Sequence, residues 1–432
     1  MGSTVAVIGC GYVGLTTGAC LAHLGHDVTC ADIDADRIAR LQQGDLPIVE
    51  PGLAHIVAEG VDQGRLRFVL GAANAVAGAE FVYLSVPTPM GRDGSADLSF
   101  INAAAREIGP LLRSEAVVIN KSTVPVGSTL VVERALGRDD VSVVSNPEFL
   151  REGSAVQDFL HPDRIVIGAS DQSVAIRIAT LYLGISAPMI VTDPASAETI
   201  KYAANAFLAT KISFVNALSA VCEAVGADVN DVLRGLGYDR RIGSEFLRPG
   251  PGYGGSCLPK DTRALIRIAE DAGYDFDLLR GVVTVNEEQF DRVAEKAKDA
   301  VGGSLDGRRV AVWGLTFKAR TDDLRESPAL AVIRRLRNKG ATVQAFDPTV
   351  TPPLDSRAAA ILDGIEIAND PYSACDGADV LLVLTEWDEF RWLDFAKVEE
   401  MLAVPRVVDA RNLLDRDALK RRGFVYQAIG RA

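Results

Sequence analysis

A glycine-rich turn near the N-terminus constrains the fold more than any other feature of this sequence. Residues 4–8 are a short apolar run rich in β-branched side chains, which predicts a buried parallel strand. Gly9, Gly11 and Gly14 follow in a G-x-G-x-x-G pattern, and a helical pattern begins directly after them. The first glycine permits a tight turn, the second lets a pyrophosphate approach, and the third lets the helix pack on the strand. In this setting the turn predicts a dinucleotide-binding unit.

An acidic residue at the end of the next strand indicates which dinucleotide binds. Residues 27–31 have the pattern of a second strand, which ends at Asp32. A carboxylate at this position accepts hydrogen bonds from a ribose diol and repels a 2′-phosphate, so NAD is favoured over NADP. Arg37 leaves the other cofactor open, since a nearby arginine could accommodate that phosphate. We predict NAD as the cofactor.

Composition is typical of a large soluble enzyme. The chain has 432 residues, of which 48% are hydrophobic, enough for two or three domains with substantial cores. The formal net charge of −13 argues against a nucleic acid or an anionic membrane as partner, so a bound anion would need local basic residues. We find no apolar run that approaches a membrane span and no leader before the first strand, and therefore expect a cytoplasmic protein. The six cysteines and four histidines show no paired or metal-ligand spacing, so we expect reduced thiols and no metal.

Three parts follow one another along the chain. Residues 1–193 alternate strands and helices, which predicts a parallel, doubly wound sheet. Residues 194–304 are mostly helical, with one long helix from about residue 196 to 225. Residues 305–432 are a second α/β unit without a complete G-x-G-x-x-G pattern. The predicted fold is therefore α/β, with two Rossmann-like domains joined by a long central helix and a helical segment.

Polar segments follow several of the predicted strands. In the first part these are residues 87–89, 121–125 and 146–152, and ligands of doubly wound folds bind at this end of the strands. In the last part, residues 317–328 supply cations after its first strand, where phosphate binding is favoured over simple solvation. Lys201 and Asn205 share one face of the long helix, a pair that would be equally consistent with a solvated lysine beside an incidental asparagine.

One cysteine lies in a short segment that also contains a cation, a carboxylate and two glycines. Residues 254–261 read Gly-Gly-Ser-Cys-Leu-Pro-Lys-Asp, which places Cys257 after a glycine turn and beside Lys260 and Asp261. A nearby cation favours the reactive thiolate, and glycines let a substrate approach the backbone. A lone cysteine is more often a small buried side chain. The charges crowded around this one, Arg248 included, favour a nucleophile instead.

Several motifs occur in a fixed order along nearly the whole chain. They are residues 9–14, 50–53, 121–123, 146–152, Lys201 with Asn205, 254–261 and 318–327. Together they resemble the UDP-glucose/GDP-mannose dehydrogenase family. Residues 241–243, 246–247 and 252–255 are similar to the UDP-glucose branch of that family.

The resemblance implies an NAD-dependent enzyme that oxidises C6 of a nucleotide sugar from alcohol to acid, as from UDP-glucose to UDP-glucuronate. This four-electron change consumes two NAD⁺. An aldehyde does not readily lose a hydride from its planar carbon, so a nucleophile must add first, and a thiolate does this well. Loss of hydride from the thiohemiacetal leaves a thioester, which water cleaves. One cysteine thus explains how an alcohol dehydrogenase would continue to the acid.

The roles of the reacting side chains carry over from the resemblance. Cys257 would be the nucleophile. Lys201 would stabilise developing oxyanions, and Asn205 would add a hydrogen bond. Asp261 would act with Lys201 to orient water or move protons, and Thr123 would hold that water.

The binding residues carry over in the same way, and Glu148 would be both a substrate contact and the acid or base of the thioester stage. The cofactor contacts would be Gly9, Gly11, Tyr12, Val13, Gly14, Asp32, Arg37, Thr88, Thr123, Glu152, Lys260 and Arg325. The nucleotide-sugar contacts would be Glu148, Phe149, Leu150, Arg151, Glu152, Lys201, Asn205, Phe246, Leu247, Arg248, Pro249, Gly250, Gly254 and Lys318. Arg411 resembles a position that reaches the substrate of a partner subunit.

Alternatives remain open at this point. The substrate could be GDP-mannose or a UDP-N-acetylhexosamine, with the same chemistry. A two-electron hydroxyacid dehydrogenase can share the fold and a Lys-x-x-x-Asn pair, but it needs no cysteine nucleophile. A silent NAD-binding protein has no use for Cys257, Lys201 and Asp261.

The long helix also predicts an assembly. It is apolar on more sides than one core-facing stripe requires. Its apolar positions include Phe207, Leu208, Ile212, Phe214, Val215, Leu218 and Val221. By the resemblance, the same helix of a second subunit would cover it, so we predict a homodimer or a higher homo-oligomer. The alternative is a helix buried wholly within one chain.

Overall fold

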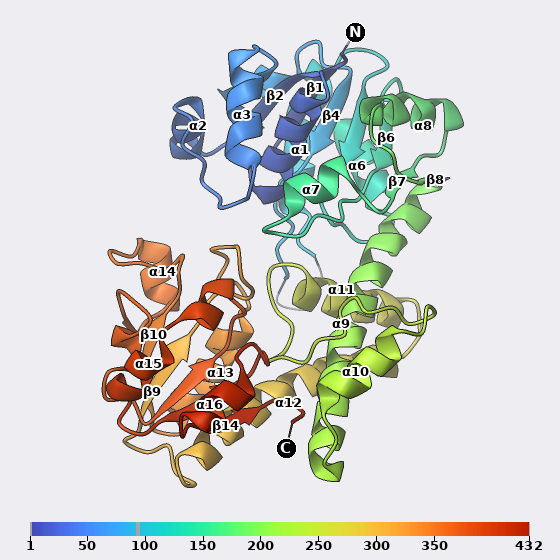
Figure 1. Cartoon of the computed structure of the whole chain (residues 1–432). Coiled ribbons are helices and arrows are strands. Elements are labelled where there is room, and N and C mark those ends of the chain that lie inside the picture. The colour runs from blue at the N-terminus through green and yellow to red at the C-terminus, as the bar shows by residue number, and fades with distance from the viewer. Residues whose placement is uncertain (1, 92–95, 432) are drawn as a thin grey trace. The chain divides into compact units, whose positions relative to one another are not determined.

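The computed structural model describes residues 2–91 and 96–431. They form two compact units (Figure 1). Unit 1 comprises Met1–Ala204 and Arg263–Gly273, and unit 2 comprises Asn205–Thr262 and Tyr274–Ala432. The three-part division expected from the sequence stays a prediction.

Unit 1 is built on a sheet whose strand order is β3-β2-β1-β4-β5-β6-β7-β8. Its strands are β1 (Thr4–Ile8), β2 (Asp27–Asp32), β3 (Leu66–Leu70), β4 (Phe81–Leu84), β5 (Val117–Asn120), β6 (Ser142–Ser145), β7 (Ile165–Gly168) and β8 (Met189–Thr192). Its helices are α1 (Tyr12–His23), α2 (Ala35–Gln42), α3 (Leu53–Asp62), α4 (Ala73–Val76), α5 (Ser99–Ile108), α6 (Ser128–Leu136), α7 (Ala155–Leu160) and α8 (Gln172–Ala179). The strand order reverses between β1 and β4, which is where ligands bind in such folds.

One pair of strands departs from the predicted parallel sheet. β6 and β7 are antiparallel, while β7 and β8 are parallel to each other. A parallel crossover usually contains a helix that carries the chain back along the sheet. The chain between β6 and β7 contains only the short helix α7, about 9 Å long at 1.5 Å per residue. β7 therefore starts near the edge at which β6 ended and runs back.

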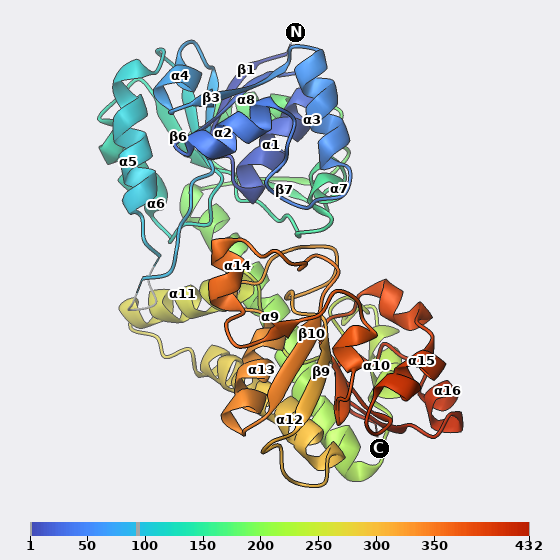
Figure 2. The ribbon, with the colours of Figure 1, turned by 90° about the vertical axis from the view of Figure 1, so that its left-hand side faces the viewer.

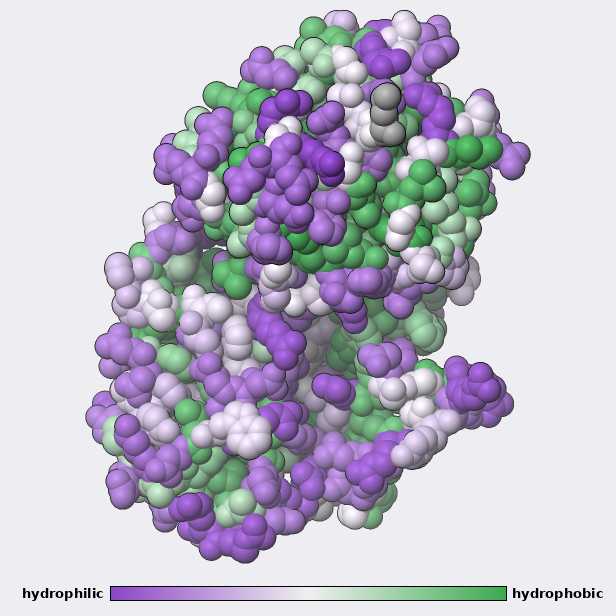
Figure 3. All heavy atoms as spheres, turned by 45° about the horizontal axis from the view of Figure 1, so that its top comes forward, coloured by the Kyte–Doolittle hydropathy of each residue, from purple (hydrophilic) through white to green (hydrophobic). Residues whose placement is uncertain are grey.

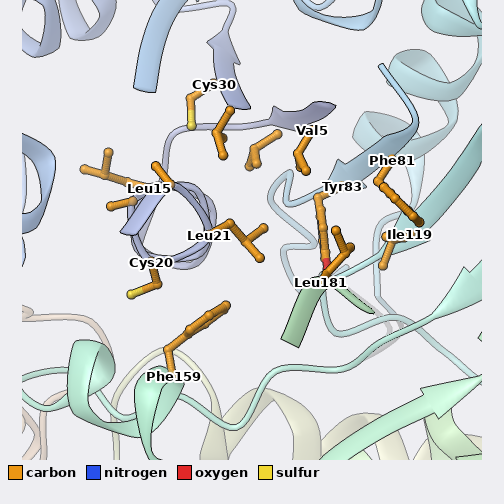
Figure 4. Packing of buried hydrophobic residues seen from close by; sticks show 14 of the residues in the cluster. Val5, Leu15, Cys20, Leu21, Cys30, Phe81, Tyr83, Ile119, Phe159 and Leu181 are labelled. Carbon is orange, nitrogen blue, oxygen red and sulfur yellow. The ribbon is translucent and has the colours of Figure 1, made fainter. Parts of the chain in front are cut away.

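Alternation along the strands divides the core of unit 1 into two layers. Val5 and Val7 of β1 point into the layer that α1, α3 and α7 cover, whereas Ala6 and Ile8 point into the layer of α4, α5 and α6. Figure 4 shows Leu15, Cys20 and Leu21 of α1 in the first layer, with Phe159 of α7 against the same core. Helix α1 can pack this closely because Gly18 has no Cβ. A Cβ there would lie 2.3 Å from the Cys30 sulfur.

Unit 2 contains a parallel six-stranded sheet with the order β11-β10-β9-β12-β13-β14. Its strands are β9 (Arg309–Trp313), β10 (Thr342–Phe346), β11 (Glu366–Ile367), β12 (Val380–Val383), β13 (Arg406–Asp409) and β14 (Val425–Ala428). Its helices include α10 (Val229–Gly237), α12 (Asp277–Ala300), α13 (Pro328–Asn338), α14 (Ser356–Ile361), α15 (Phe395–Met401) and α16 (Arg416–Arg421). Helices α12 and α13 cover one face of this sheet, and α15 and α16 cover the other (Figure 2). The predicted second α/β unit is confirmed.

Two helices belong partly to each unit. The long helix α9 (Pro194–Val225) begins in unit 1 and ends in unit 2, so the predicted helix over residues 196–225 is confirmed with one additional half-turn. Helix α11 (Leu258–Asp271) begins in unit 2, directly after the nucleophile candidate.

Helix α9 is the one helix, within the described residues, whose length and composition would let it cross a membrane. The expectation that no apolar run approaches a membrane span is wrong for this helix. The core helix of a soluble protein passes the same test. The buried side of α9 contains the polar residues Ser213, Asn216 and Ser219, which pack against protein. On the face in Figure 3, hydrophilic and hydrophobic residues are interspersed, as on an ordinary water-exposed surface.

Candidate active site

The three glycines of the N-terminal turn meet three different environments. Gly9 has φ of +100°, and a Cβ on it would lie 2.6 Å from the Ser85 carbonyl oxygen. A Cβ on Gly14 would lie 1.8 Å from the Gly9 carbonyl oxygen, which requires the close approach of helix to strand. A Cβ on Gly11, the residue before α1, would meet no atom within 4 Å. The turn is therefore tight where it must be and open where a pyrophosphate would approach the helix terminus.

Asp32 at the end of β2 is tied to this turn. Its carboxylate accepts from the Cys10 amide at 2.8 Å and from the Asp34 amide at 3.0 Å. Arg37 donates to the same carboxylate at 2.9 Å. Asp32, which favours NAD, and Arg37, which could accommodate NADP, thus form an ion pair. This contact orients the Asp32 carboxylate and partly neutralises it.

The loops after β4 and β5 meet beside the turn. Thr88 donates from its hydroxyl to the Thr123 carbonyl at 2.8 Å, so these two predicted contacts lie together. The neighbouring Lys121 is buried and donates to Asn146 at 3.1 Å. Asn146 also accepts from the Tyr182 hydroxyl and donates to the Val166 carbonyl. These bonds fix the start of the segment after β6.

That segment, residues 146–152, holds most of the predicted substrate contacts of unit 1. Glu148 is buried and accepts from the ammonium of Lys201, also buried, at 2.8 Å. Its second oxygen accepts from the Leu150 amide at 2.6 Å. The Phe149 ring lies between two cations, 3.6 Å from the Arg164 guanidinium and 5.4 Å from the Lys201 ammonium. Burial lowers the pKa of Arg164.

The next two residues of the segment have different surroundings. Arg151 is exposed and pairs with Asp158 of α7 through its backbone amide, at 2.8 Å, and its guanidinium. Glu152 follows it and is half-buried. Arg151 would have to leave or share Asp158 to contact a ligand.

Cys257 stands at the amino end of α11, since its carbonyl accepts the first helical hydrogen bond, from Asp261, at 2.8 Å. A helix amino terminus stabilises negative charge, which suits a thiolate. Cys257 is half-buried, and its sulfur lies 3.5 Å from the Ser256 hydroxyl. One turn into the helix, Asp261 is fully buried and accepts from Asn205 at 2.6 Å and from Lys260 at 2.6 Å. Asn205, Lys260 and Asp261 are thus one charged, hydrogen-bonded group beside the thiol.

The other five cysteines have no such setting. All are buried, while Cys257 is half-buried. Burial raises the pKa of Cys20 to about 12 and that of Cys375 to about 12, so both stay protonated thiols at neutral pH. Exposure and helix position therefore separate Cys257 from the rest.

The turn before Cys257 requires its glycines. A Cβ on Gly254 would lie 2.1 Å from the Glu326 carbonyl oxygen, and one on Gly255 would lie 2.8 Å from the Phe317 ring. The turn therefore packs on the loop after β9, which includes Lys318 and Arg325. Arg325 forms a bidentate pair with Asp323 at 2.8 and 2.7 Å, and the Lys318 ammonium lies 5.4 Å from the Phe317 ring centre.

The predicted loop Phe246–Gly250 is held by buried polar side chains. Asn216 of α9 accepts from the Gly250 amide at 2.9 Å, and Gln289 of α12 donates to the Gly250 carbonyl at 2.8 Å. Leu247, Pro249 and Gly250 are buried, whereas Arg248 is exposed. Arg411 lies against Gly250 of its own chain and pairs with Glu386 at 3.0 Å.

Sequence reasoning missed the residues that hold these loops. Asn286 accepts from the Tyr253 amide at 2.8 Å and donates to its carbonyl at 3.1 Å, and Gln289 acts similarly on Gly250. Both are buried on α12. Polar residues at core-facing positions of an amphipathic helix are the signal that could have found them.

The structure brings some predicted residues together and pairs others differently. Glu148, Phe149 and Lys201 form one group in unit 1, and Asn205, Cys257, Lys260 and Asp261 form another in unit 2. Lys201 donates to Glu148 and Asn205 donates to Asp261, while the expected partnership of Asp261 with Lys201 stays a prediction. Within the described residues no cluster of three or more His, Cys, Asp or Glu could hold a metal.

Comparison with known proteins covers the whole chain. Residues 3–186 match the NAD binding domain of the UDP-glucose/GDP-mannose dehydrogenase family, residues 195–288 its central domain, and residues 311–416 its UDP binding domain. A UDP-glucose 6-dehydrogenase of Rhizobium meliloti is 47% identical over 438 residues, which cover 99% of both chains.

Solved structures agree with this comparison. A UDP-glucose dehydrogenase of Pyrobaculum islandicum superposes with a TM-score of 0.92 at 38% identity, over 100% of this chain and 98% of that one. A UDP-D-ManNAc dehydrogenase of Pyrococcus horikoshii has a TM-score of 0.87 at 27% identity and covers 99% of both chains. The protein is a member of the UDP-glucose/GDP-mannose dehydrogenase family.

Proposed function

We propose that this protein oxidises UDP-glucose at C6 to UDP-glucuronate, with two NAD⁺ consumed for each sugar nucleotide. The observation that carries the proposal is Cys257, a half-buried thiol at the amino end of a helix beside the Asn205–Lys260–Asp261 group. The likeness to UDP-glucose dehydrogenases over the full chain supports this substrate over GDP-mannose or a UDP-N-acetylhexosamine.

Unit 1 fits the cofactor. Gly11 is open where a pyrophosphate would lie against the start of α1, and Asp32 is placed for the ribose. Thr88 and Thr123 flank the same edge of the sheet. When bound, NAD⁺ supplies the hydride acceptor for both oxidations.

The thiol explains the second oxidation. After the alcohol becomes an aldehyde, the Cys257 thiolate adds to the carbonyl carbon, and the oxygen takes a proton to give a thiohemiacetal. This tetrahedral carbon loses a hydride and its hydroxyl loses a proton, which leaves a thioester. Water then adds to the thioester, the thiolate leaves, and the acid is released.

The charged groups have matching tasks. Lys201 would stabilise the oxyanion of each tetrahedral species, and Glu148, its partner at 2.8 Å, would take or return the proton. Asp261, with Asn205 and Lys260 attached, would orient the hydrolytic water, and Thr123 would help to hold it. The cofactor and nucleotide-sugar contacts predicted from the sequence belong to the same proposal.

We also propose a homodimer built on α9. Phe207, Phe214 and Val221 recur every seven residues on one side of the helix and are 65%, 58% and 56% exposed. Thr210 and Ala217 lie between them and are small enough for close helix approach. Large apolar residues that lie in a row on the surface of one chain are typical of an interface that a partner covers. A single chain leaves this row uncovered, and a second copy of α9 would cover it.

We further propose that the protein is cytoplasmic, because the buried side of α9 carries polar residues. A row of exposed side chains along one side of α9 suits a helix-to-helix contact, while the other side carries buried Ser213, Asn216 and Ser219. We further propose that the chain divides into three domains, with boundaries at residues 193 and 304.

The stoichiometry of the reaction tests the function. With excess NAD⁺, UDP-glucose should yield two NADH for each sugar nucleotide consumed, because both oxidations occur before release. NADH and sugar nucleotide are quantified in parallel, with GDP-mannose and UDP-N-acetylhexosamines as competing substrates. One NADH per sugar would indicate a two-electron dehydrogenase, and none with any of these sugars would leave a protein that only binds NAD.

Replacing the nucleophile tests the covalent route. Cys257→Ser should lower turnover by about 10³-fold or more, since a hydroxyl is a far weaker nucleophile than a thiolate. NAD⁺ affinity should stay within about twofold, because Cys257 is not among the predicted cofactor contacts. Rapid-quench analysis should show one NADH per enzyme with a trapped aldehyde, or two NADH per enzyme with a trapped ester. Cys257→Ala provides the comparison, since it cannot form an ester, and full acid production by either variant would remove the covalent mechanism.

Cofactor preference tests the role of Asp32. The wild type should use NAD⁺ with a higher kcat/KM than NADP⁺, and Asp32→Ala should narrow this preference about tenfold or more by removing a charged hydrogen bond. Asp27→Ala, at the opposite end of the same strand, is the matched control and should leave the ratio unchanged. Equal use of both cofactors by the wild type would show that Arg37 dominates over Asp32.

Light scattering tests the assembly. The wild type should have a mass of at least twice 46.0 kDa at working concentration. Phe214→Asp should shift the mass toward 46.0 kDa, because it places a charge in the apolar contact. Phe100→Asp, at a 43% exposed phenylalanine of α5, should not shift it. A monomeric, fully active wild type would disprove the dimer and the role of Arg411 toward a partner.

A further inference from the structure

The motif Glu50-Pro51-Gly52-Leu53 has no part in the proposed chemistry, although its acid is buried. Glu50 is 8% exposed and lies just before α3. Gly52 adopts φ of +82°, and Leu53 is buried in the same core as Val156 of α7. The motif thus docks against the segment after β6.

The Glu50 carboxylate receives donors from two separate segments, the first turn of α1 and the chain at the start of α7. One oxygen accepts from the Ala155 amide at 2.8 Å. The other accepts from the Gly153 amide at 2.7 Å and from the Tyr12 hydroxyl. The Gly153 amide also lies 2.9 Å from the Tyr12 hydroxyl oxygen. Glu50 and Tyr12 therefore form a hydrogen-bonded bridge to the end of the substrate segment.

The two segments joined by this bridge have different tasks. Tyr12 is the first residue of α1, directly after Gly11, where the cofactor pyrophosphate would lie. Gly153 and Ala155 directly follow residues 146–152, which carry Glu148, and the start of that segment is already anchored by Asn146. A movement of the first turn of α1 therefore reaches the substrate segment through one carboxylate.

The bridge needs a side chain that can accept hydrogen bonds on both of its oxygens. A carboxylate accepts on both oxygens, so it can take all three donors. Glutamine would turn an NH₂ group toward at least one backbone N–H, and two donors cannot bond to each other. Aspartate is one methylene shorter and could reach only one of the two loops.

We propose that Glu50 is a positioning residue that couples the dinucleotide turn to the substrate segment, so that NAD⁺ and the sugar nucleotide strengthen each other's binding. The identity of the sugar nucleotide rests on the proposed function. Coupling of this kind is reciprocal: NAD⁺ raises the affinity for the sugar by the same factor by which the sugar raises the affinity for NAD⁺.

Calorimetric titration of the full-length protein measures the coupling. The dissociation constant of NAD⁺ is determined with and without UDP-glucose in a Cys257→Ala background, which prevents turnover to the acid. The first oxidation is avoided by measuring at short times or by using NADH as the cofactor. We expect a coupling factor of about 10 with Glu50 present and about 1 after Glu50→Gln. In the Cys257-containing enzyme, Glu50→Gln should raise the KM for UDP-glucose more than it lowers kcat.

Two further variants separate positioning from a purely structural role. Tyr12→Phe removes only the hydroxyl and should reduce the coupling factor about as much as Glu50→Gln does. The variant that carries both changes should reduce it no further, because both changes break one bridge. Asp171→Ala, which removes an exposed N-cap of α8, lowers stability without touching the bridge and should retain the full coupling. If Glu50→Gln lowers thermal stability but keeps the coupling, Glu50 is a structural cap and the proposal is overturned.

Hydrogen exchange with NAD⁺ alone makes the test independent of the sugar. NAD⁺ should slow exchange of the Gly153 and Ala155 amides in the wild type and leave them unchanged in Glu50→Gln. Equal protection in both proteins would contradict the bridge. If UDP-glucose neither binds nor reacts, the proposed function fails, while the exchange measurement still decides the role of Glu50.

Discussion

The order of strands in the first sheet determines where the chemistry of unit 1 can take place. In the run β2-β1-β4-β5-β6, all strands are parallel, so their carboxyl ends share one edge. Asp32 ends one of these strands, and the glycine turn, Thr88, Thr123 and Asn146 each follow one. Because β1 and β4 carry chain connections that leave in opposite directions, the edge opens between them, and a ligand can enter there without displacing a helix.

Segments that leave this edge need anchors, since a loop that carries reacting groups must hold its shape. Residues 146–152 are fixed at one end through Asn146 and at the other through Glu50, and Glu148 is locked by its own chain at Leu150. The anchors are buried, hydrogen-bonded polar groups, which makes them costly to misplace and therefore specific. The same principle recurs in unit 2, where Asn216, Asn286 and Gln289 hold the loop that leads to Cys257.

Charged side chains of the proposed reaction occur in small, mutually compensated groups. Lys201 pairs with Glu148, and Asp261 pairs with Lys260 and Asn205. Isolated charges at such burial would be strongly disfavoured, and pairing offsets part of that cost. Pairing also explains how a chain with a net charge of −13 can offer cations to a nucleotide sugar: the cations are placed by local acids, independently of the global field.

Local sequence alone determined the elements of the fold. The β-branched run and the glycine turn specified β1, the turn and α1, because the strand period and the glycine conformations are local properties. The candidate nucleophile was also visible, since the glycines, the cation and the acid lie within one short segment around Cys257. Two features depended on tertiary structure. The antiparallel β6–β7 pair depends on how the connection between these strands folds, and the partners of Lys201, Asp261 and Glu50 depend on which segments meet. Hydrogen bonds such as that from Gly153 to Glu50, 103 residues apart, leave no periodic trace in the sequence, because only the packing of the sheet and its helices brings the two groups within reach.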